Sequence, residues 1–217
     1  FRRNDDGSIW LSSEGKPQVS TTDFVYLGNM NSKFQLGWGN TFSWKDFSLY
    51  FLINGRIGGK VVSLTEAYLD YQGVSKRVGD ARDYAAAHNL MWTSPDGSIT
   101  KPAMVMPDGN LAPIQDYYQT VGGNFLGSQY VYEATNFRLA EVSLGYTFRN
   151  LFGGVIRNLS LSVIGRNLFF IYKDAPVDPD IALSTKNGLG AFDIFNMPAT
   201  RSVGVNSVSY THLRAHE

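Results

Sequence analysis

Several things are missing from this sequence, and each absence removes a class of function. There is no cysteine, which excludes disulfides, thiolate metal sites and cysteine nucleophiles. Lysine plus arginine and aspartate plus glutamate both total 19, so no net charge draws the chain to nucleic acid or to an anionic surface. No run of about 18 apolar residues occurs, which excludes a membrane-spanning helix. What remains is a chain rich in aromatic residues (14%) and in glycine (22 residues).

The last residues of the chain differ in character from the rest. The stretch VSYTHLRAHE, Val208 to Glu217, is the translation of GTC TCT TAT ACA CAT CTC CGA GCC CAC GAG, a string that resembles a transposon-type sequencing adapter read in frame. We therefore expect residues 207–217 to be a foreign tail, the alternative being a natural polar extension. Without the tail His88 is the only histidine, which argues against a histidine-based metal or catalytic cluster.

What is present is alternation of apolar and polar residues. The stretch KFQLGWGNTFSWKDFSLYFLINGRI predicts two strands, residues 33–44 and 47–57, because side chains alternate between the faces of a strand. A tight turn at Lys45-Asp46 would put the apolar residues of both strands on one face. The expected pairs are Trp44 with Phe47, Phe42 with Leu49, Trp38 with Ile53 and Phe34 with Ile57. Lys-Asp is not the Asn-Gly type of turn that two-residue hairpins prefer.

A second hairpin and one more strand follow later in the chain. NFRLAEVSLGYTF predicts a strand at residues 137–148, and LSLSVIGRNLFF predicts its partner at residues 159–170. Pairing Phe148 with Leu159 aligns their apolar faces. RSVGVN begins a fifth strand at residues 201–206.

The connections alternate between short turns and long loops, at residues 58–136 and 171–200. Compact soluble domains rarely contain loops of such length, whereas outer-membrane barrels combine short periplasmic turns with long extracellular loops. Aromatic residues also gather near the strand ends, as interfacial girdles do. The pattern therefore predicts an all-β fold of antiparallel strands in a large transmembrane β-barrel, with two long extracellular loops that contain short helices.

The barrel interpretation assigns the two faces of the strands. Twelve apolar residues are expected to face lipid: Phe34, Leu36, Trp38, Phe42, Leu49, Phe51, Ile53, Val142, Leu144, Leu159, Leu161 and Val163. Glu141 and Arg166 fall on the polar faces of neighbouring strands, where we expect them to face the lumen and to pair. Placing Arg on the lipid side would cost about 2–4 kcal/mol near the midplane.

The first long loop carries signals of local order. Ser63 and Glu66 have capping-box spacing in SLTEAYLDY, which predicts a short helix. GDARDYAAAHNL, residues 79–90, predicts a second helix. The loop aromatics could stack on sugars or contact a partner, but packing within the loop is the favoured role; they are Tyr68, Tyr71, Trp92, Tyr117 and Tyr118.

Three segments resemble the SusC/RagA-type TonB-dependent transporters of Bacteroidetes outer membranes. They are YLGNMNSKFQLGWGNTFSWKDFSLYFLINGRIGGKVVSLTEAYLDYQGVSKRVGDAR (26–82), YVYEATNFRLAEVSLGYTF (130–148) and LSLSVIGRNLFFIYKDAPVDPDIALSTKNGLGAFDIFNMPATRSVGVN (159–206). The resemblance implies that residues 1–206 are the C-terminal part of a longer protein and supply the last five of about twenty-two barrel strands. Members of that family complete their last strand, often on an aromatic residue, whereas here Asn206 meets the tail.

The resemblance also implies partners and a mechanism. It implies an importer that is not an enzyme, which takes up glycans or peptides with a SusD-like lipoprotein as its lid. It implies outer-membrane lipid around the barrel of a Gram-negative cell, and coupling to the TonB complex through an N-terminal part that this chain lacks. It implies no nucleic-acid partner and no cofactor, and it does not identify substrate-binding residues.

Other interpretations account for single features. GRIGGK (55–60) fails as a phosphate-binding loop, because its glycine spacing is short and Lys60 precedes Val61 rather than Ser or Thr. Asp174, Asp178 and Asp180 supply enough oxygen for a loop calcium site or a glycosidase pair, although a rigid loop is the favoured interpretation. A soluble all-β carbohydrate-binding module or hydrolase would pack the apolar faces sheet on sheet. A passive barrel or adhesin would lack an energised plug.

Overall fold

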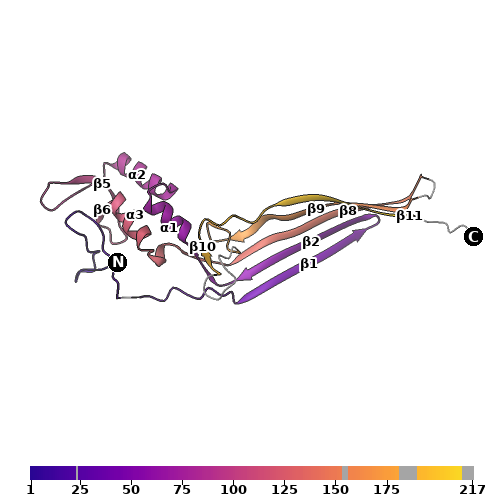
Figure 1. Ribbon diagram of the computed structural model, residues 1–217, viewed down its shortest axis with the longest axis horizontal. Coiled ribbons are helices and arrows are strands. Elements are labelled where there is room, and N and C mark those ends of the chain that lie inside the picture. Colours follow the sequence, from indigo (N-terminus) through magenta and orange to yellow (C-terminus); the bar gives the residue numbers. More distant parts are fainter. Residues whose placement is uncertain (23, 153–155, 181–189, 212–217) are drawn as a thin grey trace, which may run out of the picture.

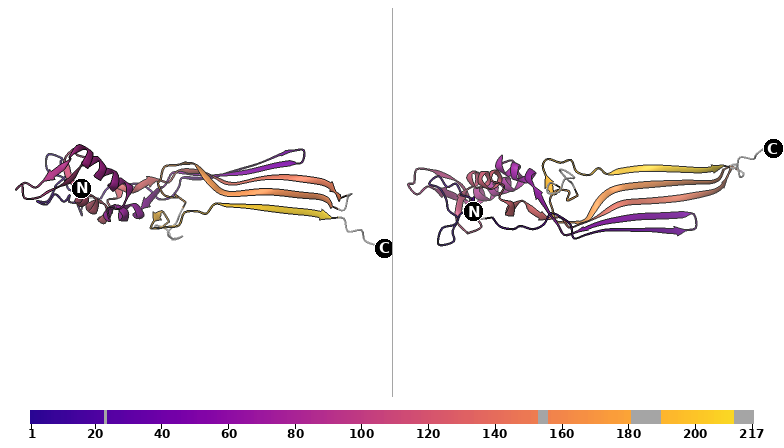
Figure 2. Two further views of the ribbon diagram at one scale, coloured as in Figure 1. Left: turned by 90° about the horizontal axis from the view of Figure 1, so that it is seen from above. Right: turned by 60° about the horizontal axis from the view of Figure 1, so that its bottom comes forward.

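The computed structural model describes residues 1–22, 24–152, 156–180 and 190–211. The chain is elongated, with a helical subdomain at one end and a long sheet at the other (Figure 1). Figure 2 shows the same separation from two further directions. Among the residues that the structure describes, no helix is both long and apolar enough to span a membrane.

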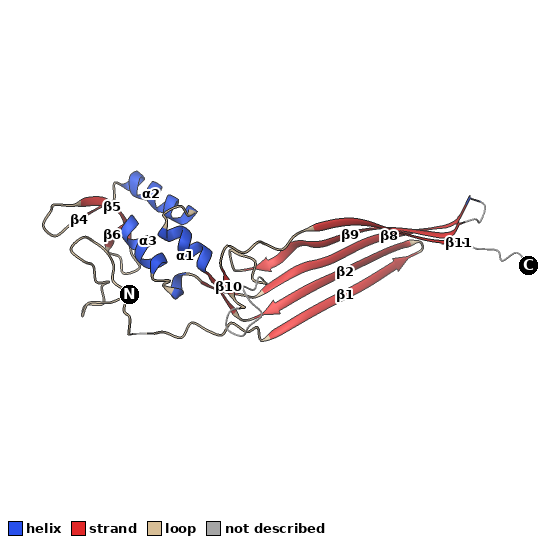
Figure 3. Cartoon of the chain, viewed as in Figure 1, coloured by secondary structure: helices blue, strands red, loops and turns tan. Residues whose placement is uncertain are grey.

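The long sheet has five antiparallel strands in the order β1-β2-β8-β9-β11 (Figure 3). Their bounds are β1 Phe34–Trp44, β2 Phe47–Ile57, β8 Asn136–Leu151, β9 Ile156–Lys173 and β11 Ser202–Thr211. The first two strands agree with the prediction to within one residue, whereas β8 and β9 are longer at both ends. Within the described part of the chain β1 and β11 have a neighbour on one side only, so the sheet is open.

The predicted register of both hairpins is confirmed. Trp44 pairs with Phe47 and Phe34 with Ile57, and Phe148 pairs with Leu159. The Lys-Asp turn is possible because Lys45 adopts a left-handed φ of 55°. Asp46 then ties the turn to β8, because its carbonyl accepts from Thr147 N at 2.9 Å and its carboxylate contacts Arg149 Nε at 2.7 Å.

Bulges in the centre of the sheet keep apolar and polar residues on separate faces. Between Leu139 and Glu141 the register shifts against both neighbouring strands. Ala140 is the additional residue against β2, whereas on the other side two residues of β9, Asn167 and Leu168, lie opposite Ala140. As a result Leu139 lies opposite Ile53 on the apolar face, while Glu141 lies opposite Arg166 on the polar face. A bulge inserts one residue on one strand and so changes the phase of the alternation.

Along the last strand, the apolar side chains change from one face of the sheet to the other. Val203 and Val205 pair with Gly165 and Val163 on the apolar face. From residue 207 onward the order reverses, because Ser207 and Ser209 pair with Leu161 and Leu159 on that face. Val208 and Tyr210 therefore lie on the polar face. The strand extends to Thr211, beyond the expected end at residue 206, and residues 212–217 of the expected tail lie outside the described residues.

The helical subdomain is formed by the first long loop together with residues 1–22. Its elements are β3 Lys60–Ser63, α1 Leu64–Tyr71, α2 Lys76–His88, β4 Met91–Thr93, β5 Thr100–Val105, β6 Leu111–Pro113, α3 Ile114–Gly123, the 3-10 helix Gly127–Gln129 and β7 Val131–Glu133. The short strand β10, Phe192–Asp193, comes from the second long loop and pairs with β3.

Both predicted helices are confirmed, and their ends have a local cause. The Ser63 hydroxyl accepts from Glu66 N at 3.3 Å and begins α1, as the capping-box spacing predicted. The helix α2 begins three residues before the predicted Gly79, because Ser75 caps it by accepting from Val78 N at 3.1 Å. It ends at His88, and the next residue, Asn89, caps it in a left-handed conformation.

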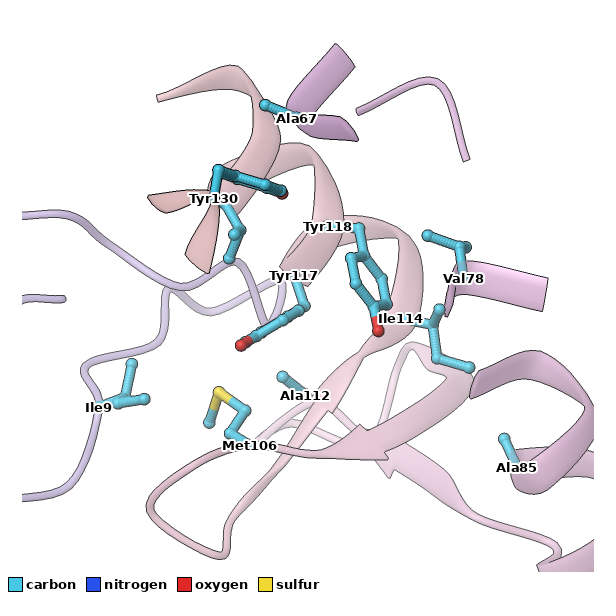
Figure 4. Packing of buried hydrophobic residues seen from close by; sticks show 11 residues of the cluster. Ile9, Ala67, Val78, Ala85, Met106, Ala112, Ile114, Tyr117, Tyr118 and Tyr130 are labelled. Carbon is cyan, nitrogen blue, oxygen red and sulfur yellow. The ribbon is translucent and has the colours of Figure 1, made fainter. Parts of the chain in front are cut away.

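The main hydrophobic core lies in this subdomain rather than in the sheet (Figure 4). Its buried members include Ile9 from the N-terminal segment, Ala67 of α1, Val78 of α2 and Tyr117 of α3. The helices α1 and α3 cross closely at Gly122, where a Cβ atom would clash with the backbone of α1. The subdomain therefore has its own core, whereas the sheet has none of comparable size among the described residues.

Candidate functional site

One face of the long sheet is apolar and largely exposed. The predicted lipid-facing residues all lie on this face by register. Eight of them are exposed: Phe34, Leu36, Trp38, Phe42, Leu49, Leu144, Leu161 and Val163. The other four are half-buried by their neighbours on the sheet: Phe51, Ile53, Val142 and Leu159. Soluble monomers rarely expose an apolar patch of this extent, so the face requires an apolar partner or solvent.

Aromatic rings form a band at the turn end of this face. Trp44 stacks against Phe47, and Phe47 and Tyr146 meet edge to face with ring centroids 4.7 Å apart. Phe148 continues the row, 4.6 Å from Tyr146. Lys45 lies over the Trp44 ring at 4.9 Å. Aromatic rings with a basic neighbour are typical of a membrane–water interface.

The opposite face of the sheet is polar. Glu141 and Arg166 are direct cross-strand partners and form an ion pair with Nε and Oε2 3.1 Å apart, which confirms the predicted pairing. Further towards the turns, the Thr147 and Ser160 hydroxyls are 3.0 Å apart. Small residues such as Gly145 line the strands between these groups. By register Tyr50, Leu52 and Ile164 are the exceptions on this face, between its polar and small residues.

A polar cavity of about 520 Å³ lies at the loop end of the polar face. Its charged groups are Arg56 of β2, Arg138 of β8 and Asp180 of the second long loop. Arg56 donates from Nη1 to Pro179 O at 3.2 Å and from Nη2 to Met30 O at 3.1 Å. Arg138 contacts Asp180 at 3.3 Å, and Asn136 donates to the same carboxylate at 3.2 Å. The cavity therefore contains two guanidinium groups and one carboxylate.

A second cavity, of about 560 Å³, adjoins the first through Arg138. The Phe170 ring lines it and has two cations nearby, with Arg138 5.8 Å and Lys173 5.6 Å from the ring centroid. Lys173 also donates to Pro176 O at 3.2 Å, which fixes the start of the second long loop. Phe170 lies on the polar face because it pairs with Arg138, which in turn pairs with Asn54. The aromatic ring and its cations thus adjoin the polar cavity.

The three loop carboxylates do not converge on a common point. Asp178 accepts from Asp180 N at 3.0 Å and from Ala199 N at 3.4 Å, while Asp180 contacts Arg138. Among the described residues no group of three or more His, Cys, Asp or Glu side chains has an arrangement that could hold a metal. The carboxylates of Asp178 and Asp180 organise the loop, in line with the favoured interpretation.

A buried ionic network holds the helical subdomain together. Asp70 is 1% exposed and forms an ion pair with Arg77. It also accepts from Ser75 Oγ at 2.5 Å and from Tyr130 Oη at 2.8 Å. Burial, together with this hydrogen bond to Asp70, raises the pKa of Tyr130. Burial is also the main cause that raises the pKa of Tyr117, to about 12.

The loop aromatics divide between two environments. Tyr117 and Tyr118 are buried in the core of the subdomain, which confirms packing within the loop for these two. Trp92 is half-buried. Tyr68 and Tyr71 are exposed, and Tyr68 meets Phe195 edge to face at 5.5 Å.

The polar cavity is the functional feature that sequence reasoning missed. Neither Arg56 nor Arg138 had been named as a site residue. The sequence did contain one signal for this cavity, because two neighbouring strands each carry an arginine near the same end. Asp180 could not be placed with them from the sequence, because 42 residues separate it from Arg138 along the chain.

Comparison with known proteins gives a consistent result. No family model matches the sequence. The chain is 22% identical over 210 residues to "TonB-dependent receptor P3" of Formosa agariphila, an alignment that covers 96% of this chain and 18% of that protein. This chain shows weak homology to a TonB-dependent receptor.

A solved structure has the same fold over the same extent. This chain is similar to the structure of "the RagAB peptide importer in the 'closed-closed' state", with a TM-score of 0.51 and 16% identity. The similarity covers 96% of this chain and 20% of that chain, so the chain spans about a fifth of the length of the proteins it matches. At this identity the likeness establishes the fold.

Proposed function

We propose that residues 1–206 are the C-terminal barrel segment of an outer-membrane TonB-dependent importer of the SusC/RagA type, and that residues 207–217 are a foreign tail. The importer would act with a SusD-like lipoprotein as its lid and would take up glycans or peptides. The N-terminal part of such an importer would contact the TonB complex. The mechanism is binding and gated passage, and no covalent bond is made or broken.

The observation that carries the proposal is the exposed apolar face of the five-stranded sheet. In β1, the apolar face extends from Phe34 to Trp44, interrupted only by Asn40. Ten residue intervals correspond to about 34 Å along a strand. A tilt of about 35–45° reduces this length to a height of roughly 24–28 Å, which matches the apolar band of about 25 Å in outer-membrane barrels. The aromatic band at the turns would then lie at one membrane interface.

The remaining features fit the same orientation. The polar face with its two cavities would line the barrel interior, and the unpaired edges of β1 and β11 would continue into further strands. The helical subdomain lies at the loop end of the sheet, which would be the extracellular side. After Asn206 the alternation of apolar and polar residues reverses, which puts Ser207 and Ser209 on the face that would contact lipid. This reversal supports a foreign tail.

Site-directed labelling tests the orientation of the sheet. The chain contains no cysteine, so single cysteines can carry spin labels in a cysteine-free version of the complete protein, reconstituted in lipid. Leu49 and Val163 occupy one cross-strand row on the apolar face, and Ser48 and Ser162 occupy the adjacent row on the polar face. We expect labels at the first pair to collide with oxygen dissolved in lipid, and labels at the second pair to collide with a water-soluble nickel chelate. Water contact at Leu49 and Val163 would refute the proposal and favour a soluble all-β module.

Transport is tested separately in cells that depend on the complete protein. Uptake of labelled glycans or peptides should be lost when TonB is deleted and when the neighbouring lipoprotein gene is deleted. Uptake that continues without TonB would indicate a passive barrel instead.

A further inference from the structure

The polar cavity at the loop end of the sheet has a surplus of positive charge. Arg56 pairs with Asn136, and Asn54 pairs with Arg138, so the two guanidinium groups project from diagonal positions on the same face. Asp180 is the only carboxylate that lines the cavity among the described residues. Two cations and one anion leave a surplus of one positive charge.

Neither arginine is fully neutralised by its protein partners. The two hydrogen bonds of Arg56 go to backbone carbonyls, which carry no net charge, and no ion pair of Arg56 occurs in the described part of the chain. Arg138 shares Asp180 with the amide of Asn136. The Nε atoms of both arginines are buried without a hydrogen-bond acceptor among the described residues. The sequence IALSTKNGL that follows Asp180 contains no acidic residue.

These features define the chemistry of a ligand. A partly desolvated guanidinium group without a counter-charge attracts anions, and its planar donors match a carboxylate in shape. A surplus of one charge suits a monoanion, because a dianion would be repelled by Asp180. The volume of about 520 Å³ lies within the range of roughly 300–1,000 Å³ that is usual for small-molecule sites.

We propose that this cavity is an anion subsite that binds a single carboxylate group of the imported molecule. The inference rests on the proposed function, and it narrows the substrate to molecules that carry a carboxylate. A peptide C-terminus and a uronic acid unit of a glycan both supply this group. Arg56 and Arg138 are the binding residues, and Asp180 sets the net charge of the site.

The experiment measures binding to the complete transporter in detergent by isothermal titration calorimetry. Two matched probe pairs separate the sources of the carboxylate. One pair is a hexapeptide with a free C-terminus and its C-terminal amide, and the other is a trisaccharide with a single galacturonate unit and the methyl ester of that unit. We expect the acid of at least one pair to bind about tenfold or more tightly than its neutral counterpart, as for a hydrogen bond to a charged group.

Variants assign this preference to the cavity. Arg56→Gln and Arg138→Gln should each bring the acid-to-neutral affinity ratio close to one, while Arg56→Lys should retain part of it. Asp180→Asn should raise the ratio, because it removes the one carboxylate that lines the cavity among the described residues, and misfolding cannot produce such a gain. Arg166→Gln is the matched control on the same face, since Arg166 is paired with Glu141, and it should leave the ratio unchanged.

Two results would overturn the inference. One is an acid-to-neutral ratio near one for both probe pairs in the unmodified protein. The other is a preference for the acid that Arg56→Gln, Arg138→Gln and Asp180→Asn leave unchanged. Because the measurement needs no energy coupling, its failure is distinct from a failure of the TonB-dependent uptake assay.

Discussion

The sharpest prediction concerns one position near the middle of the apolar face. Val142 on β8 lies opposite Phe51 and Gly165, six residues from Phe148 in the aromatic band. Six intervals correspond to about 20 Å along the strand, or about 14 Å of height at a tilt of about 45°. This places Val142 close to the midplane of an apolar band about 25 Å tall.

Val142→Arg should therefore destabilise the complete barrel strongly. Arginine at the lipid-facing midplane costs about 2–4 kcal/mol, which is a factor of about 30 to 1,000 in the unfolding equilibrium constant. The matched control is Ser143→Arg, one residue further along on the polar face. That variant should stay within about 0.5 kcal/mol of the unmodified protein, as a substitution on a solvated surface does.

The assay is urea unfolding of the complete protein in lipid vesicles, followed by tryptophan fluorescence. A second readout is the amount of folded barrel in the outer membrane, from its altered mobility in unheated gels. Equal losses for the two variants would refute the assignment of faces. A larger loss for Ser143→Arg would show that the sheet has the opposite orientation.

Three further predictions concern polar groups. Glu141→Gln should lower barrel stability by only about 0–1 kcal/mol, because the ion pair of Glu141 with Arg166 is exposed to water. A loss above about 2 kcal/mol in the same urea assay would show that this pair lies in a dry environment. Asp70→Asn should destabilise the helical subdomain by about 1–3 kcal/mol, because the buried hydrogen bonds and the ion pair with the partly exposed Arg77 are weakened. Limited proteolysis should then cut between α1 and α3, and unchanged protection would contradict the ionic network. The subdomain should keep its stability up to about pH 10 and lose it as the pH rises towards 12, because the pKa of Tyr117 is raised to about 12 in the folded state. Tyr117→Phe should weaken this dependence, measured by alkaline titration of tyrosine absorbance and protection from proteolysis, and an unchanged profile would contradict it.

The two hairpins show how far local pattern reaches. Alternation has a fixed period of two, and a shift of one residue would move every apolar side chain to the other face. The pairing of Phe34 with Ile57 and of Phe148 with Leu159 could therefore be predicted, as could the ion pair between Glu141 and Arg166. The cap at Ser63 is equally local, since it depends on residues within one helical turn.

Other features depend on contacts between distant segments. The bulge at Ala140 appears in the sequence only as a break in the alternation between Leu139 and Val142, and the pairing of β8 with β2 was needed to locate it. The burial of Tyr117 required the N-terminal segment and three helices to pack together.

The sequence by itself determined the strands, their register and the separation of an apolar from a polar face, because these follow from period-two alternation along the chain. Only the tertiary structure decided which polar residues share a cavity. Arg56, Arg138 and Asp180 come from three separate segments, and their net charge acts on a ligand only because the fold brings them to the same end of one face.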